Sequence, residues 1–436
     1  MTIARVLIAT LIAMLSPAAY AGNVVTLNAV KGATIWFAED HTVPMVAIEV
    51  SLPAGSVYDP ANKAGLASFA GAMLDEGAGG LDSKAFHDDL ADRAIEFSAS
   101  TGRDWLEITL RCESAKLADT LHLIGLALQH PRFDADAVTR VRAQMIASLQ
   151  DEDEEPGSVA EKAFYAGYFA GHAYAHPPEG TTAGMAAISQ ADLRAFVRAH
   201  WVRGGLKIAI AGDANPAQLP ALLSAAFGPL SGVTPPAPAP FRPQKHGTIF
   251  QSMDVSQPSA VFGLPAPPRS DPQYMAVYVV NTILGGKFSS RLTAEIRVKL
   301  GLTYDISTDA ELDRRASLIV GSVATRREEM RRTLTAIRNV LKRLSTDGPT
   351  DQELADAKSY LTGSFPLAFA SNAGTAGELA QFQQEGLPVT YVAQRNAAVA
   401  AVTLDDARRA AKLFDPARLL IAVAGTLPAQ QASSKH

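Results

Sequence analysis

Apolar residues follow a strand-like pattern in some segments and a helical spacing in others. This alternation predicts strands with helices grouped between them. In the first half, TLNAV, ATIWF, MVAIEVSLP, IEFSAST and DWLEITLRC are short runs rich in apolar and β-branched residues, which is typical of β-strands. Apolar residues at helical spacing predict helices near residues 64–75, 84–93, 114–129, 134–155 and 158–170. Hairpin-compatible strands with helices grouped between them predict an α+β sandwich and argue against a doubly wound parallel sheet.

The second half of the chain repeats the pattern of the first. ISQADLRAFVRAHWVRGGLKIAIAGD (188–213) and VTLDDARRAAKLFDPARLLIAVAGT (402–426) each predict a helix that opens with an S/T-x-x-D cap, followed by an apolar strand that ends in glycine. Ile208 and Ile421 lie 213 positions apart, and TLHLIGLAL (120–128) and TLTAIRNVL (333–341) have the same offset. A constant offset favours an internal duplication over chance similarity between alanine-rich helices.

A proline-rich stretch separates the two halves. PLSGVTPPAPAPFRPQKHG (229–247) has no hydrophobic period and predicts a stiff linker. We therefore expect a first domain over residues 22–228 and a second over residues 248–436, which suits a chain of 436 residues.

The first 21 residues have the pattern of a secretory signal peptide. Arg5 is followed by an apolar run from Val6 to Leu15 and by small residues that end in Ala19-Tyr20-Ala21. We expect cleavage after Ala21 and export, to the periplasm if the source is a bacterium. No later segment is long and apolar enough to span a membrane, so we expect no membrane span in the mature chain.

Charge and cysteine content exclude some functional classes. The formal net charge is −5 without a basic excess, so the sequence gives no reason to expect a nucleic-acid partner. The single cysteine, Cys112, lies in an apolar strand-like run, which favours a buried small residue over a nucleophile.

Common catalytic motifs are absent from the sequence. It contains no H-E-x-x-H, C-x-x-C, G-x-S-x-G or Walker pattern. His172 and His176 in GHAYAHPPEG are four apart, but glycine and proline at either side predict a loop and not a metal-binding helix.

The second half carries a richer polar stretch, LGGKFSSRLTAEIRVKLGLTYDIS (284–307). Gly285 and Gly286 permit close approach of another backbone, Arg297 offers a fork of donors, and Tyr304 offers a neutral hydroxyl that could stabilise an oxyanion. The same residues also suit a capping turn, a surface salt bridge and a half-buried tyrosine, and chemistry alone favours that simpler interpretation.

This stretch resembles the glycine-rich loop and the Arg/Tyr motif of the pitrilysin/insulinase family of zinc peptidases, which includes the mitochondrial processing peptidase subunits. The resemblance extends over VSLPAGSVYDPANKAGLASF, HPRFD and GHAYAHPPEGT to the closing strand. It implies two homologous α/β-sandwich domains, of the processing peptidase and LuxS metallohydrolase type, that form one half of a clamshell.

The family's H-x-x-E-H motif, which supplies two zinc-binding histidines and the catalytic glutamate, has no equivalent in this chain. Aligned on Gly65-Leu66-Ala67, the three functional positions hold Ser68, Gly71 and Ala72. The third zinc ligand of the family falls near Ala147 or Ser148. The resemblance therefore implies a degenerate zinc motif and no metal ligands in this chain.

The retained Arg297 and Tyr304 imply a role in trans. In the family, bacterial members exist as paired chains, one with the zinc motif and one with the Arg/Tyr motif. By resemblance, a homologous H-x-x-E-H partner would supply zinc. Arg297 and Tyr304 would bind the peptide substrate and stabilise the oxyanion, and Gly285 and Gly286 would seat the substrate or pack at the chamber seam.

Two alternatives remain open at this stage. The chain could be an inert scaffold or peptide-binding protein on the same fold, or an autonomous peptidase that uses other groups.

Overall fold

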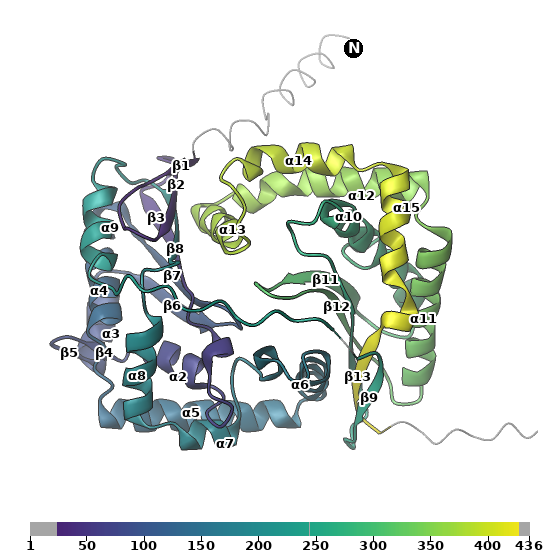
Figure 1. Ribbon diagram of the computed structural model, residues 1–436, viewed down its shortest axis with the longest axis horizontal. Helices are drawn as coiled ribbons and strands as arrows, with labels where there is room; N and C mark the ends of the chain where they lie inside the picture. The colour runs from purple at the N-terminus through teal and green to yellow at the C-terminus, as the bar shows by residue number, and fades with distance from the viewer. Residues whose placement is uncertain (1–23, 244, 427–436) are drawn as a thin grey trace, which may run out of the picture.

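The first sheet assembles from the apolar runs of the first half. The computed structural model describes residues 24–243 and 245–426, so the expected signal peptide lies outside the described residues. Within them, six strands form a mixed sheet in the order β1-β2-β8-β3-β7-β6 (Figure 1). Their bounds are β1 Val24–Thr26, β2 Thr34–Glu39, β8 Lys207–Gly212, β3 Met45–Leu52, β7 Leu106–Glu113 and β6 Glu96–Thr101.

Helices of the first half form between these strands, close to the expected ranges. The helices are α2 Leu66–Ala72, α3 Ser83–Asp92, α4 Leu117–Gln129, α5 Ala135–Glu154, α6 Pro156–Tyr168, α7 Thr182–Ala187, α8 Gln190–His200 and α9 Leu219–Phe227. Between α2 and α3 in the sequence, β4 (Gly77–Ala78) and β5 (Leu81–Asp82) form a two-stranded ribbon.

The second half builds a five-stranded sheet in the order β11-β12-β10-β13-β9. Its strands are β9 Gly247–Gln251, β10 Ser259–Pro265, β11 Ile306–Leu312, β12 Ser317–Ala324 and β13 Leu420–Ala424. Its helices are α10 Tyr274–Leu284, a π-helical segment Thr293–Lys299, α11 Met330–Asp347, α12 Asp351–Ser364, α13 Asn372–Gln384, α14 Tyr391–Ala401 and α15 Leu404–Ala411.

Strand order and register confirm the α+β class and the internal duplication. The orders β2-β8-β3-β7-β6 and β9-β13-β10-β12-β11 are equivalent, and each sheet has one parallel pair among antiparallel ones. In the parallel pairs, Ile35 lies opposite Ile208 and Thr248 lies opposite Ile421, so both partners are displaced by the same 213 positions. The capping boxes expected at Ser189 and Thr403 are present.

Each sheet is covered on one face by helices of its own half. In the first half, alternate strand residues such as Ile35, Phe37 and Ile48 pack with α2, α4 and α9 in one apolar core. In the second half, Phe262 and Ile421 belong to an equivalent core with α10, α11 and α12. Cys112 is free and buried in the first core, as expected.

The opposite face of each sheet is covered by a helix from the other half. Helix α6 of the first half packs on β13 and β10, where Phe164 fits against Gly263, a residue with no side chain to obstruct it. Helix α13 of the second half packs on β3 and β8, where Ala209 and Ala211 permit its close approach. We call α6 and α13 the exchanged helices; Figure 1 shows each of them beside the other half's strands.

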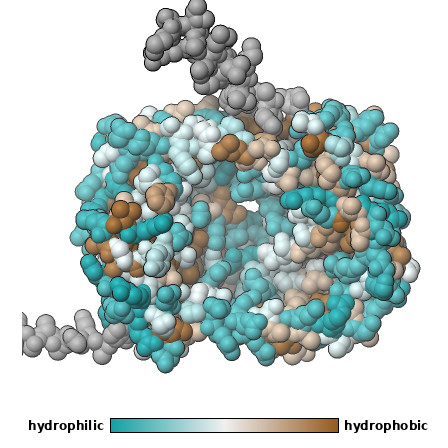
Figure 2. Space-filling view, turned by 180° about the vertical axis from the view of Figure 1, so that it is seen from behind, coloured by the Kyte–Doolittle hydropathy of each residue, from teal (hydrophilic) through white to brown (hydrophobic). Residues whose placement is uncertain are grey.

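The linker and a β-hairpin complete the junction between the halves. Carbonyl groups of the proline-rich stretch accept hydrogen bonds from Tyr58 (2.9 Å, to Pro236) and Arg315 (2.8 Å, to Pro238). The turn between β11 and β12 reaches the first half, where the Arg314 backbone N–H donates to an Asp104 carboxylate oxygen at 2.8 Å. The molecule is hollowed between its two halves (Figure 2). Among the described residues, no helix is long and apolar enough to cross a membrane.

Candidate functional site

Helix α2, where the resemblance predicts the zinc motif, starts at a specific turn. Gly65 precedes it with φ 101°, a left-handed conformation that glycine adopts without strain. The Asp59 carboxylate accepts hydrogen bonds from the backbone N–H groups of Gly65 and Ala67, both at 2.8 Å. Burial raises the pKa of Asp59 to about 7, against the opposing effect of these N–H groups. Gly65 and Asp59 therefore define the start of the helix.

The three positions on α2 that the resemblance assigns to the zinc motif do not fit a zinc ion. The Ser68 hydroxyl donates to the carbonyl of Pro178 at 2.6 Å, so it serves the fold. Gly71 is buried, and a Cβ atom built on it would lie 2.8 Å from the Thr101 hydroxyl and 3.0 Å from Leu106. Ala72 has no donor atom. The space that a catalytic glutamate would need at Gly71 is filled by other residues of the first sheet.

The expected position of the third zinc ligand, on α5, also lacks a side chain that could bind zinc. Ala147 and Ser148 are both exposed on α5 and carry no carboxylate. Within residues 24–243 and 245–426, no group of three or more His, Cys, Asp or Glu side chains is arranged to hold a metal ion. His172 and His176 lie in the expected loop, where His172 accepts a hydrogen bond from the Tyr174 backbone N–H at 3.1 Å.

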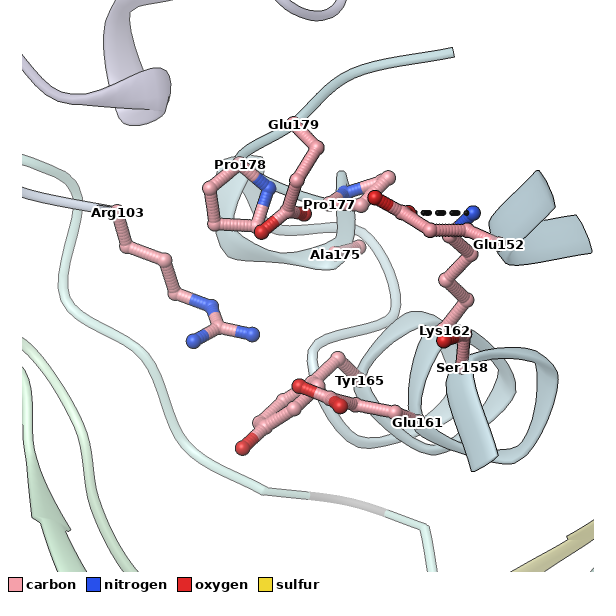
Figure 3. Close-up of a pocket in the computed structure, with 10 residues that line it drawn as sticks. All are labelled: Arg103, Glu152, Ser158, Glu161, Lys162, Tyr165, Ala175, Pro177, Pro178 and Glu179. Carbon is pink, nitrogen blue, oxygen red and sulfur yellow. Dashed lines mark ion pairs between the residues drawn. The ribbon is translucent and has the colours of Figure 1, made fainter. Parts of the chain in front are cut away.

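A cavity of about 230 Å³ lies near Ser68 of α2. Pro178, whose carbonyl accepts the hydrogen bond from Ser68, is part of the cavity wall. Figure 3 shows the side chains of Arg103, Glu161 and Glu179 directed toward the same space, while Lys162 pairs with Glu152 at 3.1 Å. We call this the first cavity.

Charges are closely packed around the first cavity. The Arg103 guanidinium lies 3.9 Å from the ring centroid of Tyr165, on exchanged helix α6, and the Tyr165 hydroxyl donates to Glu311 of β11 in the other half. Burial, together with the neighbouring carboxylates of Glu179 and Glu311, raises the pKa of Glu161. This mixed-charge pocket was not expected from the sequence; its wall comes from residues 152–179 together with Arg103, which the fold brings beside them.

The glycine pair of the second half lies at the C-terminal end of α10. Gly285 is buried, its N–H donates to Asn281 at 2.9 Å, and its carbonyl accepts from the Thr308 N–H at 3.3 Å. A Cβ atom on Gly285 would lie 2.3 Å from the Thr308 hydroxyl oxygen. The chain that approaches Gly285 closely is therefore the protein's own strand β11, whereas Gly286 is partly accessible.

Arg291, at the start of the next helix, has a structural role. Its guanidinium donates to both carboxylate oxygens of Glu353, at 2.6 and 2.7 Å, and to the carbonyl of Gly348. Although burial opposes it, these hydrogen bonds and those from Thr350 lower the pKa of Glu353 to about 2. This bidentate pair fixes the segment that carries Arg297 onto α12.

Tyr304 is exposed, whereas Arg297 is partly buried. The Arg297 guanidinium lies 5.0 Å from the ring centroid of Phe288, a side chain that is 72% exposed, and Tyr304 is 91% exposed. The turn before Tyr304 is held by the Thr303 hydroxyl, which donates to the Ala324 carbonyl at 2.8 Å. Among the described residues, no hydrogen bond or ion pair occupies the Arg297 guanidinium or the Tyr304 hydroxyl, so both can bind another molecule.

Two family descriptions match consecutive parts of the chain. Residues 34–182 match the family described as Insulinase (Peptidase family M16), and residues 187–361 match the description Peptidase M16 inactive domain.

Two curated relatives match most of the chain. A protein named non-peptidase homolog YmxG, from Helicobacter pylori, is 26% identical over 357 residues, which are 81% of this chain and 83% of that protein. An uncharacterized zinc protease from Streptomyces coelicolor is 26% identical over 322 residues, 72% of this chain and 69% of the relative.

Among solved structures, a peptidase M16 inactive domain from Pseudomonas fluorescens has a TM-score of 0.87 and 28% identity, covering 94% of this chain and all of that one. A chain of Complex III2 from Candida albicans, at 15% identity and a TM-score of 0.77, covers 92% of this chain and 95% of its own, and shares the fold.

Proposed function

Because the chain belongs to the M16 insulinase family of peptidase homologues, we propose that it is the non-metal subunit of an exported heterodimeric zinc peptidase. The proposed partner is a homologous chain with an intact H-x-x-E-H motif, which supplies the zinc, the water and the general base. This chain supplies Arg297 and Tyr304 to a chamber closed by both subunits. No peptidase activity is expected from it alone.

The observation that carries the proposal is a contrast between the two halves. At the expected zinc positions, the Ser68 hydroxyl is bonded to Pro178, and Gly71 and Ala72 have no ligand atom. In the second half, Tyr304 is exposed, and Arg297 is partly exposed without a hydrogen bond or ion pair among the described residues. A surface that served only for packing would gain no stability from an unpaired guanidinium stacked on an exposed phenylalanine. A peptide carbonyl offers the acceptor that Arg297 lacks.

Each residue would have a separate chemical role. The Arg297 fork would hold a backbone carbonyl of the peptide, away from the bond that is cut. Its stacking on Phe288 restricts the guanidinium before the substrate arrives and so reduces the entropic cost of binding. The Tyr304 hydroxyl would donate to the oxyanion that develops at the scissile carbonyl.

A second candidate, an inert scaffold or peptide-binding subunit, is favoured by one observation. The Helicobacter pylori relative is named a non-peptidase homolog. This candidate predicts a stable partner without peptidase activity in the complex, and it assigns no kinetic role to Arg297 or Tyr304.

The test is a kinetic comparison of complexes. The tagged chain is purified from its native cells with its partner, and cleavage of an unfolded polypeptide is measured for the complex and for the isolated chain. We expect activity only in the complex, and we expect Tyr304→Phe to lower its kcat/KM about 100-fold, as for the loss of one oxyanion donor. Arg297→Ala should raise KM more than it lowers kcat.

Arg332→Ala is the matched control, because Arg332 lies exposed on α11. Complexes with unchanged kcat/KM in both site variants would overturn the proposed roles. A complex that forms but cleaves nothing would favour the scaffold.

A further inference from the structure

Strand β9 has the same place in the second sheet as β2 has in the first. The backbone N–H of Thr34 donates to the carbonyl of Leu206 at 2.8 Å, and the N–H of Gly247 donates to the carbonyl of Leu419 at 2.9 Å. Both partners are displaced by the 213 positions of the internal duplication. Each residue of β2 therefore has a counterpart in β9, and the two strands can be compared residue by residue.

The outer edge of β2 is covered by another strand. Because Thr34 bonds to the β8 side, Ile35 and Phe37 direct their backbone groups to the opposite side. There the N–H of Leu27 donates to the Ile35 carbonyl at 2.9 Å, and Val25 of β1 lies opposite Phe37 in an antiparallel pair.

The outer edge of β9 has no such cover. The counterparts of Ile35 and Phe37 are Thr248 and Phe250, whose backbone groups point away from β13 in the same way. Within residues 24–243 and 245–426, β9 is the last strand of its sheet, and no strand pairs with this edge. The Phe250 side chain is 55% exposed, whereas that of Phe37 is fully buried.

The size of one side chain argues that a strand, and not a helix, fits beside β9. In the first half α9 packs on α4, where a Cβ atom on Gly125 would lie 2.9 Å from the Cα atom of Ala226. The counterpart of Gly125 is Arg338 of α11, which donates to the Thr248 hydroxyl at 2.8 Å. A helix cannot approach over this arginine as α9 approaches over glycine.

The sequence of β9 suits pairing with a second copy of itself. GTIFQ (247–251) has no charge and no proline, which are features that protect exposed edges from pairing. If two copies run antiparallel with Ile249 opposite itself on a two-fold axis, Thr248 lies opposite Phe250 of the other copy. The outward-facing residues then exchange N–H···O bonds, and each ring lies beside a β-branched side chain.

Charges beside the strand favour the same arrangement. Lys245, before β9, is exposed, and Asp254, after it, has a side chain that is 91% exposed although it pairs with Arg327 at 2.6 Å. In the antiparallel pair, the lysine of each copy lies close to the aspartate of the other. Opposite charges therefore meet at both ends of the shared edge.

We propose that β9 is the interface through which two copies of this chain associate, with their second sheets joined edge to edge. Tyr304 precedes β11, at the opposite edge of the sheet, with β12, β10 and β13 between them. The association therefore leaves the proposed substrate site accessible. This inference goes beyond the proposed function and does not depend on it.

Cysteine cross-linking of the purified chain tests the interface and its register. The one native cysteine, Cys112, is buried, so it does not compete with an added thiol. Ile249→Cys places two thiols opposite each other in a non-hydrogen-bonded pair, and mild oxidation should convert most of the protein to a dimer on a non-reducing gel. Gln251→Cys is the matched control and should stay monomeric, because its two thiols would be about 13 Å apart along the strands.

Sedimentation equilibrium gives a second measurement. The mass of the wild type should rise toward twice that of the monomer as the protein concentration increases. Phe250→Pro should remain monomeric, because proline removes an outward N–H without removing a bond to β13. Circular dichroism checks that this variant is folded.

Four results would overturn the proposal. They are equal cross-linking of the two cysteine variants, a wild type that stays monomeric at every concentration, a dimer that persists in Phe250→Pro, and cross-linking of Ile249→Cys only to a homologous partner chain. The last result would assign the edge of β9 to that partner.

Discussion

Asp313, in the turn between β11 and β12, gives the sharpest prediction about stability. This turn docks on the first half, and one Asp313 carboxylate oxygen is buried there without a hydrogen-bond partner. Burial raises the pKa of Asp313 from 3.8 to about 7; Arg103 opposes the change, and the charges of Asp104 and Glu311 add to it. We predict that Asp313→Asn stabilises the protein at high pH.

The sign and size follow from proton linkage. The folded protein binds the Asp313 proton more tightly than the unfolded chain does, so the stability from this group is fully present below about pH 4 and is lost as the pH rises to about 7. A difference of about three pH units is worth on the order of 4 kcal/mol, which the ionised side chain costs at pH 8. Asparagine stays neutral, so its gain over the wild type should be about 4 kcal/mol at pH 8 and about 1–2 kcal/mol at pH 5.

Urea unfolding of both proteins at pH 5 and pH 8 measures this difference. The exposed Asp405→Asn variant controls for the change in net charge and should show no such pH-dependent gain. The reasoning is refuted if Asp313→Asn is less stable than the wild type at pH 8, or if its gain is the same at both pH values.

Two further predictions concern the core and the metal. Phe164→Ala should lower the free energy of unfolding by about 3–5 kcal/mol, because this fully buried ring of α6 fills the space beside Gly263, whereas Phe288→Ala at a 72% exposed position should change it by less than about 0.5 kcal/mol. Urea unfolding compares the two, and similar losses would contradict the packing of α6. A chelator should leave the thermal midpoint of the isolated chain unchanged in calorimetry, since Ser68, Gly71 and Ala72 provide no zinc site; a lowered midpoint that zinc restores would contradict this.

Local signals in the sequence predicted most of the elements. Strand runs such as MVAIEVSLP and the caps at Ser189 and Thr403 depend on neighbouring residues only, so they can be identified without the fold. The exchange of α6 and α13 could not be predicted in this way. The alternation in IAIAG (208–212) is between large and small apolar residues, which indicates burial on both faces of β8, but an apolar face does not specify which helix covers it.

The candidate site was likewise predicted from the sequence only in part. The positions of Ser68, Gly71, Ala72, Arg297 and Tyr304 came from motifs that the family resemblance brought out. The first cavity was missed, because Arg103 and Glu161 meet only through the fold. At Gly285, the sequence correctly indicated a close approach, but a strand of the same chain provides it.

The exchanged helices also fix the order in which the nascent protein can finish folding. When the ribosome has completed β8 at Gly212, the face of the first sheet that carries Trp36, Ala209 and Ala211 has no cover, because α13 begins only at Asn372. At about 5–20 residues per second, the missing helix follows roughly 10–30 s later. During that interval the first half presents an apolar sheet that a chaperone can hold, and a chain that stops after the linker never buries it. Synthesis of nearly the whole polypeptide is thus the condition for a closed first domain.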